Sequence, residues 1–274
     1  MRIARITNPD GGGLLFAAVA PGPDGELVAA ELADQPFTDI RPTGRVWPLA
    51  DVRLMAPILP SKVVCVGKNY ADHVREMGGD EPPADPIIFL KPSTTVIGPN
   101  APIRLPADST RVDFEGELAV VIGLPPADLR TGLGTRDVPA ERAMEIVFGC
   151  TVANDVTARD QQQADGQWTR AKGHDTFCPL GPWIDTDLDP SDLALTTELD
   201  GEVRQRSRTS LLLHDVPALI AWISRVMTLL PGDVILTGTP AGVGPMTPGQ
   251  SVSVTIDGLG TLTNPVTAAP APRS

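Results

Sequence analysis

Short apolar runs recur along the chain, and most are followed closely by glycine or proline. They span residues 14–19, 26–30, 63–66, 87–90, 118–122, 146–152, 193–199, 234–237 and 252–256. Runs of this length, bounded by turn residues, are typical of β-strands. The 274 residues include 29 prolines and 26 glycines, which favours many short elements over a helical bundle.

Two segments have helical signals. Residues 139–145 follow Asp137, which we expect to cap the helix, and Pro139 suits a first helical turn. Residues 217–230 place apolar side chains at helical spacing, and Pro231 is expected to end that helix. Many strands with few helices predict an α+β fold that is mainly β, with an antiparallel or mixed sheet architecture and peripheral helices.

The first part of the chain is expected to form a small β-rich N-terminal unit over residues 1–57. Two of its apolar runs flank the Pro- and Gly-rich segment 21–25, as in a hairpin. Pro57 and Pro60 then separate it from a second, larger unit over residues 58–274. The sequence does not indicate what the N-terminal unit does.

Charge and composition restrict the partners. The net charge is −12 and no Lys/Arg-rich run interrupts it, so we expect no nucleic acid and no membrane partner. No stretch approaches the roughly 20 apolar residues that span a bilayer. The N-terminus has no signal-peptide core, and the three cysteines lack metal-type spacing, so a cytoplasmic location is expected. An anionic substrate would need a local positive site, such as a metal ion.

Glu115 and Glu117 lead directly into the apolar run 118–122. Because side chains alternate along a strand, both carboxylates should point the same way. Two like charges at that position are costly unless a cation lies between them. A solvated strand end is the alternative interpretation, and for an isolated pair it would be favoured.

Asp155 adds a third acidic side chain, after the apolar run 146–152 and beside a dense polar cluster. Three carboxylates form an all-oxygen set, which selects Mg²⁺, Mn²⁺ or Ca²⁺ over Zn²⁺. The ligands alone do not say which of these ions binds.

His73 and Glu76 share one face if the chain is helical from residue 71 onward. A carboxylate beside an imidazole orients the ring and supports its charged form, as in a water-activating base. A surface ion pair is the plainer interpretation, and a metal-binding His/Glu pair is a weaker third.

Residues 236–244 close an apolar run with a Gly-rich loop, LTGTPAGVG. Such a loop exposes backbone N–H groups and small hydroxyls that can hold a carboxylate. Taken alone, this loop is only a turn. Lys172, in the segment WTRAKG, is likewise only a surface lysine when it is considered alone.

Together these segments resemble the fumarylacetoacetate hydrolase superfamily over roughly residues 60–265. Four motifs carry the resemblance in the right order, GKNYADHVREM, VDFEGELAVVIG, NDVTARDQQ and LTGTPAGVG, with support from RAKGHDTFCPLGPW. The resemblance implies a mixed β-sheet roll and a homodimer. It also implies Mg²⁺ or Mn²⁺ on Glu115, Glu117 and Asp155, and a His73–Glu76 dyad on a lid over the substrate.

Further site residues follow from the resemblance only. Lys172 would be catalytic, and the substrate site would comprise Arg159, Gln162, Thr239, Gly238, Lys91 and Tyr70. Two departures separate this chain from the hydrolase that names the superfamily. Its N-terminal unit is shorter, and Val66 stands where that enzyme has a fourth metal carboxylate.

The implied substrate is a small anionic 2-oxo acid, of the kind met in aromatic catabolism. A cation would stabilise its enolate, and His73 would activate water for hydrolysis of a C–C bond in an acylpyruvate-type acid. Oxaloacetate decarboxylation ranks second, and isomerisation of 2-hydroxyhepta-2,4-diene-1,7-dioate-type diacids third. Two other classes stay open at a lower rank: a non-catalytic homologue that binds a metabolite, and a β-rich structural protein that binds no cation.

Overall fold

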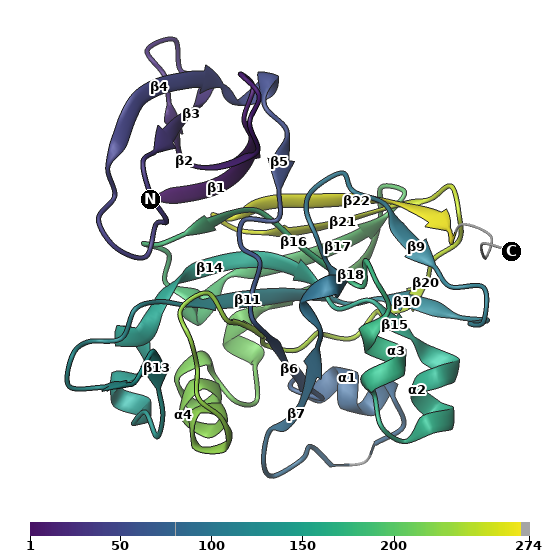
Figure 1. Ribbon diagram of the computed structural model, residues 1–274. Coiled ribbons are helices and arrows are strands. Elements are labelled where there is room, and N and C mark those ends of the chain that lie inside the picture. Colours follow the sequence, from purple (N-terminus) through teal and green to yellow (C-terminus); the bar gives the residue numbers. More distant parts are fainter. Residues whose placement is uncertain (80, 270–274) are drawn as a thin grey trace, which may run out of the picture.

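One large mixed sheet runs through the molecule and carries most of the strands that lead to the site (Figure 1). The computed structural model describes residues 1–79 and 81–269. Ten of the twelve strands lie side by side in the order β4 (Pro42–Pro48), β3 (Leu27–Leu32), β2 (Leu14–Pro21), β1 (Arg2–Thr7), β16 (Cys178–Asp185), β14 (Val147–Asn154), β11 (Gly116–Ile122), β19 (Val234–Leu236), β6 (Val63–Gly67) and β7 (Ile87–Lys91). The remaining two are β5 (Leu54–Met55), beside β1, and β8 (Val96–Ile97), beside β16.

Three smaller sheets complete the strand inventory of the described residues. The five-stranded sheet has the order β18 (Glu202–Arg208), β17 (Ala194–Leu199), β21 (Ser251–Ile256), β22 (Gly260–Ala268) and β9 (Ile103–Leu105). The three-stranded sheet comprises β15 (Thr157–Ala158), β10 (Val112–Phe114) and β20 (Gly244–Pro245). β12 (Arg130–Thr131) and β13 (Gly134–Thr135) form a two-stranded ribbon.

Helices are few and short, and they lie outside the sheets (Figure 1). The α-helices are α1 (Ala71–Glu76), α2 (Arg159–Asp165), α3 (Thr169–Gly173) and α4 (Val216–Val226). Short 3₁₀ helices span Leu49–Asp51, Ser93–Thr95, Ala140–Ile146, Pro190–Asp192 and Thr209–Leu211. Most strand pairs are antiparallel, but β6 is parallel to β19, β8 is parallel to β16 and β9 is parallel to β22. The predicted fold class, α+β and mainly β, is confirmed.

The main core lies between the large sheet, the five-stranded sheet and α4. Val120 and Val152 of the large sheet pack in one buried cluster with Val254 of β21 and with Leu219 and Ile223 of α4. Each fully buried aliphatic side chain of this kind contributes about 1.5–3 kcal/mol. This core holds β11 and β14 together, and the candidate site lies where β11 begins and β14 ends.

The N-terminal strands have a small core of their own, which includes Ile6 and Val19. The expected hairpin is present, because β2 and β3 pair across the turn at residues 21–25. β1 also pairs with β16, so the N-terminal strands extend the edge of the large sheet. A division of the chain at residue 57 remains a proposal.

The first predicted helix was wrong in type and in its cap. Ala140–Ile146 is a 3₁₀ helix, and no side chain caps it. Asp137 instead has a positive φ of 51°, and its backbone N–H donates to the Ser224 carbonyl of α4 at 3.1 Å. The chain is thereby tied to α4 before the helix begins.

The second predicted helix was placed correctly but extended too far. α4 begins after Asp215, whose side chain accepts a 2.9 Å hydrogen bond from Ala218 N. It ends at Val226, before Pro231, because Leu229 exchanges two backbone hydrogen bonds with Thr135 of β13. This tertiary pairing draws the chain out of the helix. Among the described residues, no helix combines the length and the apolar character that crossing a membrane requires.

Candidate active site

Three buried carboxylates meet where two neighbouring strands of the large sheet begin and end. Glu115 lies between β10 and β11, and Asp155 directly follows β14. Asp155 N donates to the Glu115 carbonyl at 2.8 Å, and Glu115 N donates to Asn154 Oδ1 at 2.9 Å. One carboxylate oxygen from each of Glu115, Glu117 and Asp155 lies within 4.8 Å of the others. The strand register therefore brings together residues that are 40 positions apart.

Two of these carboxylates are paired with buried lysines. Lys172, on α3, donates from Nζ to Glu115 Oε2 at 2.8 Å and to Asp155 Oδ2 at 2.7 Å. Lys91, at the end of β7, lies 2.5 Å from Asp155 Oδ1. Both lysine side chains are buried, so neither is a surface lysine. Burial works against a charged lysine, but Asp155 and Glu115 outweigh it and raise the pKa of Lys172.

Glu117 differs from the other two because it has no ion-pair partner among residues 1–79 and 81–269. Its Oε2 atom accepts a 2.6 Å hydrogen bond from Gly238 N. Burial, together with the charges of Asp155 and Glu115, raises the pKa of Glu117 well above its ordinary value. A divalent cation on the three carboxylates would relieve this repulsion. The buried acidic triad could hold a metal ion, and its oxygen donors suit Mg²⁺ or Mn²⁺.

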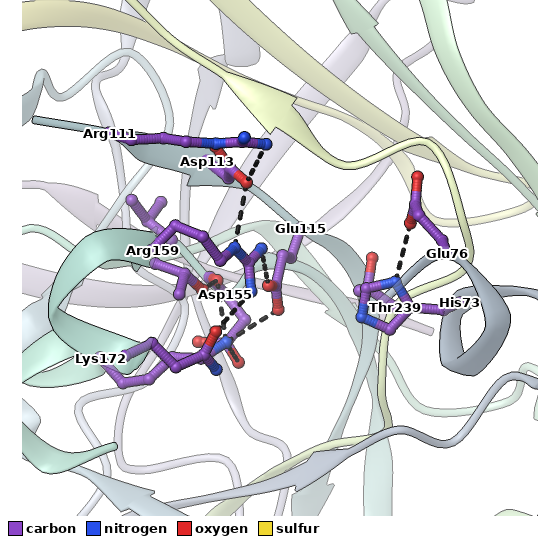
Figure 2. A network of polar contacts seen from close by, with 12 residues as sticks. His73, Glu76, Arg111, Asp113, Glu115, Asp155, Arg159, Lys172 and Thr239 are labelled. Atoms are coloured by element: carbon purple, nitrogen blue, oxygen red, sulfur yellow. Dashed lines mark hydrogen bonds and ion pairs between the residues drawn. The ribbon is translucent and has the colours of Figure 1, made fainter. Parts of the chain in front are cut away.

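Arg159 connects the carboxylate cluster to a second buried acid. It is the first residue of α2, and its Nη2 donates to Glu115 Oε1 at 2.6 Å. Its Nε donates to Asp113 Oδ2 at 3.0 Å, and its Nη1 donates to Gln162 Oε1 at 2.7 Å. Figure 2 shows the guanidinium group between Asp113 and Glu115. Protein acceptors therefore fix all three of its nitrogens.

His73 and Glu76 form a hydrogen-bonded pair on α1, one turn apart (Figure 2). His73 Nδ1 lies 3.0 Å from Glu76 Oε2, and the imidazole is buried. The other oxygen, Glu76 Oε1, accepts a 2.9 Å hydrogen bond from Gly242 N. The Gly-rich loop thus holds two carboxylates of the protein, Glu117 through Gly238 and Glu76 through Gly242.

A cavity of about 240 Å³ opens over the carboxylates. Eight of the residues named from the sequence line it: His73, Glu115, Glu117, Asp155, Arg159, Gln162, Lys172 and Thr239. Four others lie behind the lining. Glu76 supports His73, Lys91 supports Asp155, and Gly238 supports Glu117. Tyr70 is buried directly before α1, and its backbone pairs with Leu212.

One wall of the cavity is aromatic and was missed at the sequence level. Trp168 and Phe89 meet edge to face with their ring centroids 5.1 Å apart, and Lys172 Nζ lies 5.0 Å from the Phe89 ring. Trp168 also lies over Gly67, where a Cβ atom would come within 2.5 Å of the indole. A usable signal was present, because Phe89 lies two residues before Lys91 and so shares its strand face.

The comparisons with known proteins identify the family. The sequence model of the family "Fumarylacetoacetate (FAA) hydrolase C-terminal" matches residues 62–267. The chain belongs to the fumarylacetoacetate hydrolase family. A second family model, "Rv2993c-like, N-terminal", matches residues 1–57 ahead of the fumarylacetoacetate hydrolase region.

Relatives in the fumarylacetoacetate hydrolase family carry several different names. Protein Rv2993c of Mycobacterium tuberculosis is 62% identical over 271 residues, which cover 97% of this chain and 98% of that protein. A mitochondrial oxaloacetate tautomerase of Xenopus laevis is 43% identical and matches 79% of this chain and 69% of its own length.

Solved structures show the same fold over almost the whole chain. The 2-hydroxyhepta-2,4-diene-1,7-dioate isomerase of Mycobacterium marinum is 59% identical, with a TM-score of 0.87 and 98% coverage of both chains. The maleylpyruvate hydrolase of Sphingobium sp. SYK-6, solved with a manganese(II) ion and pyruvate, is 30% identical. Its TM-score is 0.77, with 98% of this chain and 100% of that chain covered. The family and these neighbours indicate an enzyme.

Proposed function

We propose that this chain is a divalent-metal-dependent hydrolase that cleaves a C–C bond in an acylpyruvate-type 2-oxo acid. The observation that carries the proposal is the position of His73. Its imidazole lines the same cavity as the three carboxylates, while Glu76 holds Nδ1 from behind. A positioned base beside a cluster of oxygen ligands is the arrangement that hydrolysis of such an acid requires.

Glu115, Glu117 and Asp155 would hold the metal, Mg²⁺ or Mn²⁺, and a Ca²⁺ ion also suits these donors. When bound, the ion supplies Lewis acidity toward the oxygens of a 2-oxo acid. Lys91 and Lys172 keep Asp155 oriented toward the cluster, since both donate to its carboxylate oxygens.

His73 would act as the general base. With Nδ1 engaged by Glu76, Nε2 has no hydrogen-bond partner among the described residues and can take a proton from water. The carboxylate of Glu76 then stabilises the imidazolium that forms. Such general-base catalysis typically contributes a factor of about 10²–10⁴ to the rate.

Two side chains are placed to donate to an oxygen that becomes negative. Lys172 Nζ donates to Glu115 Oε2 and Asp155 Oδ2, and its third hydrogen bond, to the Asp155 backbone oxygen, is long at 3.5 Å and can give way to a stronger acceptor. The Gln162 side-chain oxygen accepts a hydrogen bond from Arg159, and the Gln162 amide N–H groups have no partner within the described residues. Donors fixed in advance in a buried site stabilise developing charge strongly.

A second candidate is isomerisation or tautomerisation of the same class of acid. The identities favour it, because the relatives named tautomerase and isomerase are 43% and 59% identical, whereas the named hydrolase is 30% identical. These reactions move protons along the substrate and need no attacking water. The same His73 would serve them as the base.

The deciding experiment is a substrate panel with Mg²⁺, Mn²⁺ or EDTA. An acylpyruvate, fumarylpyruvate, oxaloacetate and a 2-hydroxydienedioate are followed by ultraviolet absorbance and by product analysis. Hydrolysis predicts two carboxylic acid products, isomerisation predicts one product of unchanged mass, and EDTA should silence either. Turnover that persists in EDTA would remove the metal from the proposal, and no turnover of any member would count against an enzyme of this class.

We also propose a cytoplasmic homodimer. All three cysteines are buried and free, which suits a reducing compartment. The dimer rests on membership of the family, and sedimentation or light scattering of the purified chain tests it directly.

A further inference from the structure

Asn69 lies between two parts of the candidate active site. It follows β6 and precedes α1, the short helix that carries His73 and Glu76 and lies beside the end of β6 (Figure 1). Because β6 is parallel to β19, the chain leaves both strands at the same edge of the sheet. Asn69 therefore meets the Gly-rich loop that follows β19. Its side chain is only 1% exposed and lies outside the cavity lining.

The side-chain amide of Asn69 makes three hydrogen bonds, all of them to the backbone. Nδ2 donates to the Thr237 carbonyl at 2.8 Å and to the His214 carbonyl at 2.9 Å. Oδ1 accepts from His214 N at 2.8 Å. Among side chains of this length, only asparagine has two donors together with an acceptor. The amide thus joins three segments of the chain, those before α1, after β19 and before α4.

One peptide group connects Asn69 to the carboxylate cluster. The Thr237 carbonyl accepts from Asn69. The N–H of the same peptide group belongs to Gly238 and donates to Glu117 Oε2 at 2.6 Å. Thr237 N and Thr237 Oγ1 both donate to the Leu118 carbonyl at 3.1 Å, which fixes this peptide to β11 without help from Asn69. Glycine permits the close approach, because a Cβ atom at Gly238 would lie 2.7 Å from Asn69 Cβ.

The helix α1 is too short to fix its own position. It has six residues, and its N-cap residue, Tyr70, gives it no side-chain hydrogen bond. A single helix of this length is marginal in water. At its far end, Glu76 accepts from Gly242 N. At its start, the Asn69 carbonyl accepts from Leu213 N at 2.9 Å, and the Asn69 amide supplies the link to the Gly-rich loop. Loss of that amide would loosen the start of α1 and leave the loop peptide on β11.

We propose that Asn69 is a positioning residue, which sets the place of His73 relative to the carboxylate cluster by tying the start of α1 to the peptide that binds Glu117. The proposal rests on the proposed function, in which His73 is the base. Because Asn69 lies outside the cavity lining, it acts on the reaction through His73. A base must lie within hydrogen-bond reach of the proton that it removes, and a displacement of about 1 Å can cost about a hundredfold in rate.

The kinetic test compares Asn69→Ala with Asn264→Ala. Asn264, on β22, is also 1% exposed, and its Nδ2 donates to the carbonyls of Gly98 and Ala101 at 2.9 and 2.8 Å. It lies outside the cavity lining as well. Both variants should melt below the wild type, because each leaves two buried carbonyls without a donor. Asn69→Ala alone should lower kcat, by about tenfold to a hundredfold, with KM and the Kd of Mn²⁺ within about threefold of the wild type.

A spectroscopic test does not depend on turnover. The chain has three histidines, so the imidazole Cε1–H signals of ¹³C-labelled protein are few, and His73→Ala identifies the signal of His73. In Asn69→Ala the His73 signal should shift while that of His174 stays in place. In Asn264→Ala neither signal should move. An unmoved His73 signal in folded Asn69→Ala would overturn the proposal.

The kinetic outcomes separate positioning from plain stability. An equal loss of kcat in Asn69→Ala and Asn264→Ala would mean that Asn69 only stabilises the fold, and would overturn the proposal. Loss of Mn²⁺ binding in Asn69→Ala would also overturn it, because the amide would then hold the cluster and not the base. If Asn69→Ala is not recovered folded, Asn69→Ser takes its place. Its hydroxyl donates one hydrogen bond, so the fall in kcat should be smaller but still absent from Asn264→Ser.

Two further outcomes separate the positioning role from the proposed reaction. A shifted His73 signal in Asn69→Ala, in a protein that hydrolyses no member of the substrate panel, would support the positioning role and reject the hydrolase. Wild-type kcat in Asn69→Ala, with turnover that requires His73, would overturn the positioning role alone.

Discussion

The Oε2 atom of Glu117 accepts a 2.6 Å hydrogen bond from the backbone N–H of Gly238. This contact joins a carboxylate of the cluster to the Gly-rich loop, and it is the one strong hydrogen bond that the described residues give Glu117. Glu115, two residues earlier, is instead held by Arg159 and Lys172. The two carboxylates of one candidate metal site are thus stabilised by different contacts. Replacing each by the neutral amide should therefore change the free energy of unfolding in opposite directions.

Glu117→Gln should stabilise the metal-free protein. The amide oxygen can still accept from Gly238, and the substitution removes a buried charge without a cationic partner. Because the folded-state pKa of Glu117 is raised, its ionised form costs stability as the pH rises above the ordinary value near 4.3. At pH 8 in EDTA we expect the free energy of unfolding to rise by about 1 kcal/mol, and the Tm by about 2 °C.

Glu115→Gln is the matched comparison and should act in the opposite direction. It leaves Arg159 and Lys172 facing a neutral amide in a buried site, which costs about 3–5 kcal/mol. Added Mn²⁺ at about 100 times its Kd should stabilise the wild type by about 2.7 kcal/mol, and both variants by much less. Thermal melts in EDTA and in Mn²⁺ measure both effects. An equal Mn²⁺ shift in wild type and variants would contradict the ligand assignment.

His73→Ala should lower hydrolytic turnover at least about 100-fold while Mn²⁺ binding persists, because the imidazole is the proposed base and not a ligand. Glu76→Gln should lower kcat by a smaller factor, about tenfold, since it keeps the ring in place but removes the charge that supports imidazolium. Steady-state kinetics and metal titration separate the two roles. Full hydrolytic activity in His73→Ala would rule out the dyad.

Gly242→Ala should destabilise the loop that holds Glu76. Gly242 has a φ of +101°, and a Cβ atom there would lie 2.1 Å from the Arg204 carbonyl oxygen. Gly249→Ala is the control, because Gly249 has a similar φ of +97° with no heavy atom within 4 Å. Gly249→Ala should lower the free energy of unfolding by about 1 kcal/mol through backbone strain, and Gly242→Ala should lower it several times more. Urea unfolding compares them, and equal losses would show that the contact with Arg204 is unimportant.

Asp160 should contribute stability that is lost in acid. Burial alone would raise its pKa, but hydrogen bonds from Ser109 and Thr110 outweigh it and lower the pKa to about 2. The ionised form therefore stabilises the fold above the ordinary value of about 3.9, and that contribution disappears as the pH falls toward about 2. Asp160→Asn should cost about 1 kcal/mol at pH 7 and progressively less as the pH falls from about 4 toward about 2, by urea unfolding. A deficit that stays constant with pH would contradict this.

Much of the fold was readable from local patterns. Strands at residues 63–66 and 118–122 were expected from apolar runs next to glycine, and β6 and β11 lie there. The helical spacing of residues 217–230 likewise located α4, but its end depended on the pairing of Leu229 with Thr135. Local helix propensity cannot predict a helix end that depends on a partner more than 90 residues away in the sequence.

The candidate site divides in the same way. Alternation along an extended chain predicted Glu115 and Glu117 on one side, and three-residue spacing paired His73 with Glu76. Both relations are local, because Glu115 directly precedes the strand that carries Glu117, and His73 and Glu76 lie on one helix. Resemblance, and not spacing, proposed Lys172. The catalytic and metal-binding roles of these residues stay proposals, but the structure places them close together.

What the sequence determined by itself is therefore local: which segments are strands, which carboxylates face the same way, and which histidine has an acidic neighbour. The tertiary structure decided what those groups meet. The pairing of β11 with β14 brings Asp155 to Glu115, and the packing of α3 buries Lys172 between them. Asp113 comes to hold two arginines that the sequence places 48 positions apart. Burial and charge pairing arise only when distant segments pack together, and they set the chemistry of this site.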